Sequence, residues 1–219
     1  MDAVEPDGAT ARRDGGWIDA TRPLRNSIPV WPGDRPFALE QRREPDFVFS
    51  AFSTTCHVGT HLDAPLHVDP RGRAVEAVPI ERLVGAAEVV HLPGSHRALV
   101  PDDLPRGWSP AASRVLVRTD SYPIDGAMDG GFAALSPELA NWLGDRGVEL
   151  VGIDTPSVDL FSSPHYPTHH ALANRGMTWI EGLWLGEAPA GLYELVALPI
   201  LLEGADGAPV RAILRSVEC

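Results

Sequence analysis

Lysine is absent from this sequence of 219 residues, so all 18 basic residues are arginine. The absence excludes every chemistry that needs a lysine amine, including Schiff-base and pyridoxal-phosphate enzymes and P-loop nucleotide binding. Basic residues are also few beside the 30 acidic ones, which leaves a net charge of -12. A surface this acidic disfavours binding to nucleic acid or to an anionic membrane.

Cysteine is scarce as well, with only Cys56 and Cys219 in the chain. Two cysteines exclude a disulfide scaffold and a zinc cluster of thiolates, and they favour a reducing compartment. No apolar run reaches the roughly 18 residues that a membrane-spanning helix needs. Residues 1–15 are polar and lack the apolar segment of a secretory signal, so we expect a disordered leader before one cytoplasmic domain at 16–219.

Segments rich in β-branched residues recur along the chain between scattered glycines and prolines. With 44% hydrophobic residues, the chain is typical of a globular domain built from many short strands. The strands are expected at 47–55, 86–92, 114–119, 149–154, 178–185, 192–198 and 209–215.

One helix is clearly marked between the third and fourth of these strands. Ser136 suits the N-cap, Pro137 suits the first helical position, and Gly147 ends the helix. A helix between two strands predicts a parallel βαβ unit. A second helix is expected at 169–175. Because few helices separate the later strands, the predicted class is mixed α/β with a partly antiparallel sheet.

Histidine is concentrated in two windows, of which the first reads HVGTHLDAPLH at 57–67. His57, His61, Asp63 and His67 occupy odd positions between mostly apolar residues, a pattern that indicates extended chain with one buried face. Extended residues four apart are separated by about 13 Å, so these histidines can share an ion only where the chain bends, as Gly59 allows. Three histidines and an aspartate this close together predict a site for zinc or manganese.

The second window holds His165, His169 and His170 and is followed by Glu181 in an apolar segment. Adjacent histidines diverge on a helix or a strand, so at most one of His169 and His170 should reach the same ion. A buried Glu181 needs a partner, either an arginine or a metal, and the nearby histidines favour the metal.

Other catalytic signatures are missing from the sequence. It has no G-x-S-x-G, H-E-x-x-H, G-x-G-x-x-G or G-x-x-x-x-G-K motif. These absences disfavour a serine hydrolase, a zincin, a dinucleotide enzyme and a phosphoryl-transfer enzyme.

The chain resembles the metal-dependent cyclase family and, within it, the branch of bacterial kynurenine formamidases. The resemblance runs from about residue 17 to residue 215. It implies a single swivelling β/β/α-type α/β domain and a homodimer. It also implies two divalent ions per chain, with zinc as the preferred metal and manganese as the alternative. The strings that carry it are HVGTHLDAPLH at 57–67, VWPGD at 30–34, VGIDTPSVD at 151–159, HHALANRGM at 169–177, IEG at 180–182, YELVALPI at 193–200 and PVRAILR at 209–215.

The same resemblance implies a role for each matching residue. Asp63 and Glu181 would bridge the two ions, His67 would be the general acid/base, and Trp31 would pack against the aromatic ring of the substrate. The segment 160–168 departs from the family pattern and is expected to border the pocket. The implied metal ligands are His57, His61, Asp63, His169 and Glu181.

The implied reaction is that of an arylformamidase of tryptophan catabolism, the hydrolysis of N-formyl-L-kynurenine to L-kynurenine and formate. One alternative is a related cyclase-family hydrolase of isatin or another cyclic or aryl amide. The other is a metal-binding protein without turnover. His67 and Trp31 argue against the latter, since neither is needed to hold an ion.

Overall fold

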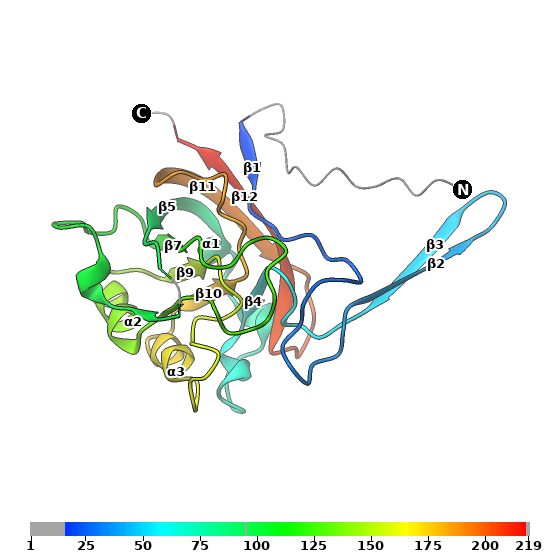
Figure 1. The fold of residues 1–219 in the computed structure, drawn as a ribbon, viewed down its shortest axis with the longest axis horizontal. Coiled ribbons are helices and arrows are strands. Elements are labelled where there is room, and N and C mark those ends of the chain that lie inside the picture. Colours follow the sequence, from blue (N-terminus) through cyan, green and yellow to red (C-terminus); the bar gives the residue numbers. More distant parts are fainter. Residues whose placement is uncertain (1–15, 95, 218–219) are drawn as a thin grey trace.

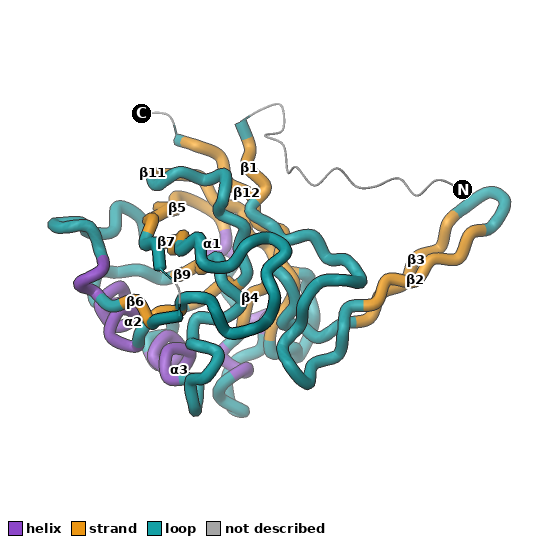
Figure 2. Tube along the Cα trace, viewed as in Figure 1, coloured by secondary structure: helices purple, strands orange, loops and turns teal. Residues whose placement is uncertain are grey.

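The computed structural model describes residues 16–94 and 96–217, so the expected leader lies outside the described residues. Most of its strands form one mixed sheet, shown in Figures 1 and 2. In sheet order they are β1 (Trp17–Asp19), β12 (Gly207–Ser216), β11 (Gly191–Pro199), β5 (Val84–His91), β7 (Arg114–Arg118), β9 (Leu150–Ile153), β10 (Thr178–Glu181) and β4 (His61–Asp63).

A further pairing closes this sheet into a barrel. β12 hydrogen-bonds not only to β11 and β1 but also to β4, at the opposite end of the sheet, so every strand except β1 belongs to a closed ring. The pairs among β5, β7, β9 and β10 are parallel and the others are antiparallel. The predicted mixed α/β class with a partly antiparallel sheet is therefore confirmed, and closure into a barrel is an addition to it.

The predicted βαβ unit is present. Helix α2 (Pro137–Gly144) lies between β7 and β9, which pair in parallel. The Ser136 hydroxyl accepts a hydrogen bond from the backbone N–H of Leu139 at 3.1 Å, so it caps the helix as expected. α3 (Pro167–Asn174) starts two residues before the predicted second helix. In the described part of the chain no helix is long and apolar enough to cross a membrane.

Two apolar cores flank the parallel strands. Leu116 on β7 belongs to the core that draws on all barrel strands and fills the barrel interior. Its neighbours Val115 and Val117 face the second core, in which the outer surface of the sheet packs against α2 and α3. The remaining short elements are β6 (Ala98–Leu99), β8 (Ala134–Leu135), α1 (Ile80–Leu83) and the 3₁₀ turns Pro65–His67, Val75–Ala77 and Pro101–Asp103.

A β-hairpin extends away from the barrel (Figure 1, cyan). Its strands are β2 (Ala38–Arg43) and β3 (Val48–Ser53). β3 matches a predicted strand, whereas β2 was not predicted. The hairpin exposes large apolar side chains, with Phe47, Phe49 and Phe52 each more than half exposed.

The strand predicted at 178–185 is shorter than expected. β10 ends at Glu181 because Gly182 adopts a φ of +66°, which turns the chain. A Cβ at Gly182 would lie 2.0 Å from the carbonyl oxygen of Gly59, so no larger residue fits between these two segments. The turn leaves Glu181 at the very end of the strand, next to the first histidine window.

Candidate metal centre

Closure of the barrel places β4, which carries His61 and Asp63 of the first histidine window, between two strands that are distant from it in sequence. β4 pairs with β10 so that Glu181 lies opposite His61 and Trp179 lies opposite Asp63. On the other side, β4 pairs with β12. Residues more than a hundred positions apart thus meet at one end of the barrel.

The chain bends on both sides of β4, as the sequence predicted. Gly59 has a φ of +61°, and a Cβ there would lie only 2.8 Å from the side chain of Leu24. After Asp63 the chain enters the 3₁₀ turn at Pro65–His67. The two bends bring His67 back beside His57, with ring centroids 4.1 Å apart.

Two buried carboxylates lie between two buried histidines. His61 Nε2 is 3.4 Å from Asp63 Oδ1 and 3.3 Å from Glu181 Oε2. His169 Nε2 is 3.5 Å from Asp63 Oδ2 and 3.2 Å from Glu181 Oε1. Each carboxylate therefore faces both histidines. None of these side chains is more than 4% exposed.

His57 joins the same cluster from the more exposed side. Its Nδ1 lies 2.7 Å from Asp63 Oδ1. The structure thus brings all five predicted ligands together around Asp63. Ligand atoms of His57, Asp63 and His67 also lie within 4.8 Å of one another, so His67 is close enough to contribute to an ion held there. His165 and His170 are exposed and do not line the pocket.

In each of the three predicted histidine ligands, the ring nitrogen that points away from the carboxylates of the cluster is hydrogen-bonded to another group. His57 Nε2 lies 2.9 Å from Asp206 Oδ2, and His169 Nδ1 lies 2.7 Å from Asp159 Oδ2. His61 Nδ1 donates to a backbone carbonyl at 3.2 Å. A hydrogen bond of this kind fixes the tautomer and aims the free nitrogen at a metal. Neither aspartate was predicted as a site residue, although Asp159 ends the string VGIDTPSVD.

The charges in the cluster fit a cation. Burial raises the pKa of Asp63 and of Glu181, but the neighbouring histidines outweigh it and hold both below their usual values. Burial lowers the pKa of His57, yet Asp63 and Asp206 raise it to about 10. Two buried carboxylates this close need positive charge beside them. Protonated histidines supply it in the metal-free chain, and divalent ions can replace those protons.

Trp179 adds a contact that the sequence did not reveal. Its indole Nε1 donates to Asp63 Oδ2 at 2.9 Å from a fully buried position. The hydrogen bond fixes the rotamer of the carboxylate around which the other ligands gather. The only signal in the sequence is a tryptophan two residues before Glu181.

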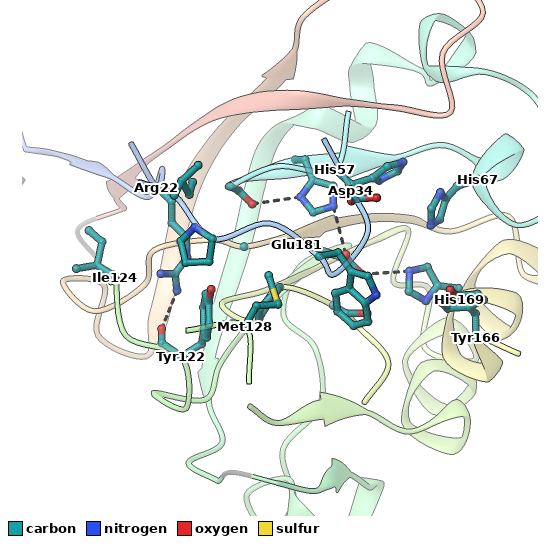
Figure 3. Close-up of a pocket in the computed structure, with 18 residues that line it drawn as sticks. Arg22, Asp34, His57, His67, Tyr122, Ile124, Met128, Tyr166, His169 and Glu181 are labelled. Carbon is teal, nitrogen blue, oxygen red and sulfur yellow. Dashed lines mark hydrogen bonds and ion pairs between the residues drawn. The ribbon is translucent and has the colours of Figure 1, made fainter. Parts of the chain in front are cut away.

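A cavity of about 180 Å³ opens beside the cluster. In Figure 3 His67 and His169 lie at one end of it, and Arg22 lies at the other. The predicted residues that line it include Trp31, His67 and Glu181, while Asp63 lies behind them. Its apolar wall is formed by Ile28, Pro29, Trp31, Ile124, Met128 and Pro156.

Trp31 lies in this wall and is backed by aromatic rings. Its ring centroid is 4.7 Å from that of Phe161 and 6.5 Å from that of Phe132. The 160–168 segment thus supports Trp31 through Phe161 and lines the cavity through Tyr166, whose ring meets His169 edge-on at 5.7 Å. The segment therefore borders the pocket, as the sequence predicted.

Arg22 is the one arginine among the cavity-lining residues of the described chain, and its terminal nitrogens are engaged. Nη1 donates to the carbonyl of Pro123 at 2.8 Å, and Nη2 donates to those of Tyr122 and Asp154 at 2.7 and 2.8 Å. Burial lowers the pKa of Arg22 to about 10, although Tyr122 and Asp154 oppose it. The guanidinium stays charged at neutral pH, and three of its five N–H groups donate to carbonyls, while the buried Nε has no hydrogen-bond partner.

Comparison with known proteins gives one family and one fold. Residues 18–160 match the model of a family described as "Putative cyclase". A solved potential metal-dependent hydrolase with cyclase activity is 30% identical, with a TM-score of 0.81 over 93% of this chain and 98% of that one. A predicted metal-dependent hydrolase from Bacillus stearothermophilus is also 30% identical, with a TM-score of 0.78 over 90% and 97%. Isatin hydrolase A from Labrenzia aggregata is 26% identical, with a TM-score of 0.78 over 92% and 94%.

Proposed function

The chain belongs to the cyclase family of metal-dependent hydrolases, and on that premise we propose that it hydrolyses aryl amides, with neutral cyclic amides of the isatin type as first candidates. The observation that carries the proposal is the cluster of His, Asp and Glu ligands at the end of an aromatic-walled cavity. A site that only stores an ion or supports the fold does not require a cavity beside the ion.

The donor set of three histidines and two carboxylates fits two divalent ions. Zinc is the preferred metal and manganese is the alternative. His57, His61 and Asp63 would hold one ion, and His169 would hold the other with Glu181. A bound ion would supply a Lewis acid that polarises a carbonyl and activates water near neutral pH.

His67 is placed to handle the proton of the reaction. In amide hydrolysis the carbonyl carbon keeps the hydroxyl of water, and the departing nitrogen takes up a proton. His67 lines the cavity and is 26% exposed, and its Nδ1 lies 3.3 Å from Asp206 Oδ2. With Nδ1 donating to Asp206, Nε2 is free to take a proton from the attacking water and to pass it to the departing aryl nitrogen.

The contacts of Arg22 favour an uncharged substrate. Isatin carries no carboxylate, and three of the five N–H groups of this guanidinium already donate to backbone carbonyls. N-formyl-L-kynurenine is the second candidate, supported by the shared VWPGD and GIDTPS strings. Its ammonium group would meet Asp34, which lines the cavity, but its carboxylate would find only those donors of Arg22 that the carbonyls leave free.

One assay tests these alternatives. Purified protein is incubated with isatin and with N-formyl-L-kynurenine side by side, before and after removal of metal by a chelator, and then with zinc or manganese restored. We expect metal-dependent opening of isatin at a higher kcat/KM than formate release. A preference for the formamide would reverse the order of the candidates, and turnover that survives metal removal would refute the metal-dependent mechanism.

We also propose that the protein is a homodimer that uses the hairpin β2–β3 as a contact arm. The arm projects from the barrel and exposes several large apolar side chains, which in a soluble monomer would be in contact with water. Light scattering coupled to gel filtration tests this. A Phe49→Asp and Phe52→Asp double variant should be monomeric if the arm forms the interface, whereas an unchanged mass would exclude the arm.

A further inference from the structure

Asp206 occupies an unusual place beside the metal centre. It lies on the segment just before β12, at the seam where the barrel closes, and its carbonyl accepts a hydrogen bond from the N–H of Ala64 at 2.9 Å. Its side chain is 42% exposed, yet one oxygen contacts two histidines. Oδ2 lies 2.9 Å from His57 Nε2 and 3.3 Å from His67 Nδ1.

We propose that Asp206 is a positioning residue that fixes the rings of both His57 and His67 and thereby connects ion binding with proton transfer. The inference rests on the function proposed above. Because a carboxylate oxygen only accepts, both histidines must donate to it. Protonation of His57 at Nε2 leaves Nδ1 free to face Asp63 and an ion. Protonation of His67 at Nδ1 leaves Nε2 free for the substrate.

The shared oxygen also explains why the two rings lie so close. Their centroids are 4.1 Å apart, and both nitrogens that face Asp206 converge on the same atom. Loss of the carboxylate would free each ring to rotate and to exchange tautomers. Rotation of the His57 ring is expected to lower the affinity for the ion. Rotation of the His67 ring is expected to slow the reaction even when the ion is bound.

Asp159 provides a matched control within the same site. Its Oδ2 contacts His169 Nδ1 at 2.7 Å, and both its oxygens accept backbone N–H groups at the start of α3. It thus supports one histidine ligand but not His67. An Asp159→Asn variant should lower zinc affinity through His169, but it should leave the Nδ1–H tautomer of His67 unchanged.

The experiment compares Asp206→Ala, Asp206→Glu and Asp159→Asn with the unaltered protein. Zinc affinity is measured by competition with a chromogenic chelator, kcat for isatin is measured at saturating zinc, and ¹⁵N spectra of the histidine rings report their tautomers. Asp206→Ala should lower zinc affinity roughly 10- to 100-fold and kcat at saturating zinc by at least about tenfold. It should also shift His67 away from the Nδ1–H tautomer, and Asp206→Glu should recover part of each loss.

The readouts separate this proposal from the proposed function. If the unaltered protein does not open isatin, the function fails, but zinc affinity and the ring spectra still test Asp206. Unchanged affinity and unchanged tautomers in Asp206→Ala would overturn the proposal. Full recovery of kcat at saturating zinc would also overturn it, because Asp206 would then act on His57 alone.

Discussion

The two sides of the metal centre share Asp63 but differ in burial. On the inner side, His61, His169 and Glu181 are between 2% and 4% exposed and come from β4, α3 and β10. On the outer side, His57, His67 and Asp206 are 19%, 26% and 42% exposed and come from turns and loops. The same residue types are thus buried by regular structure on one side and left open to water on the other.

This difference in burial separates ion binding from catalysis. On the inner side an unneutralised carboxylate would be costly, because no water can solvate it. That side therefore demands positive charge whatever the substrate. On the outer side water and substrate can exchange, so a proton can be moved there. We expect inner-side variants to lose ions and a variant at His67 to lose turnover, while variants at His57 and Asp206, the two outer residues next to an ion, should affect both.

The largest effect is expected from Asp63→Asn, which removes the residue that both sides share. Its oxygens face His57, His61 and His169, so the variant should lose both bound metal and activity. Elemental analysis and the isatin assay measure the two losses. Asp69→Asn, a change at an exposed carboxylate, is the control and should change neither. Full metal content in Asp63→Asn would show that the cluster is not the site.

His67→Ala should keep most of the metal and lose turnover by about 10²- to 10⁴-fold, the usual contribution of a general acid/base. His169→Ala, on the inner side, should instead lose metal. His170→Ala changes an exposed neighbour and serves as the control for both. If His67→Ala empties the site, His67 is a ligand, and the division between the two sides would have to be redrawn.

Metal binding should release protons. His57 has its pKa raised to about 10, and that of His169 is also well above its usual value, although burial opposes both shifts. Near pH 7 the metal-free chain therefore holds the extra proton of His57, and zinc must displace at least this one. Calorimetry in buffers of different ionisation enthalpy counts the protons released. Release of none would mean that the histidines are already neutral.

The same shifts fix the sign of a stability change in the metal-free chain. A raised histidine pKa stabilises the fold fully below the unfolded value of about 6.5, and this contribution is lost as pH rises through about 10. Metal-free protein should therefore melt at a lower temperature near pH 10 than near pH 6. Zinc-loaded protein should show less of this trend.

The smallest effect is expected from Trp31→Ala, which alters the cavity wall without touching the ligands. It should raise KM for an aryl amide several-fold, since aromatic contacts contribute about 0.5–1.5 kcal/mol beyond burial. A small aliphatic formamide should be affected much less. Trp142→Ala, a change on α2, is the control. Equal losses for both substrates would mean that Trp31, which packs on Phe161, belongs to the scaffold.

Local signals accounted for the bends, the helix cap and the first cluster of ligands, whereas the roles of His67 and Trp31 came from the family resemblance. The cap at Ser136, the bend at Gly59 and the spacing of the first histidine window all depend on neighbouring residues, and the structure has them where they were expected. The divergence of His169 and His170 is equally local, and only His169 turns inward.

The features that the sequence missed depend on distant contacts. Closure of the barrel pairs residues 61–63 with 207–209, and no local pattern marks that partner. Asp206 and Arg22 gain their roles only from this closure and from the carbonyls around Arg22. β2 was missed for a different reason: Glu40–Arg43 is wholly polar, because the arm that it forms lies away from the core.

The position of β12 at the seam of the barrel has a consequence for the order of events during synthesis. The ribosome releases the inner side of the centre once β10 has emerged, because His61, Asp63, His169 and Glu181 all precede residue 182. Asp206 and the strand that closes the ring emerge later. The histidines of both sides are therefore made before the carboxylate that joins His57 to His67, and β12 completes the centre when it pairs with β4.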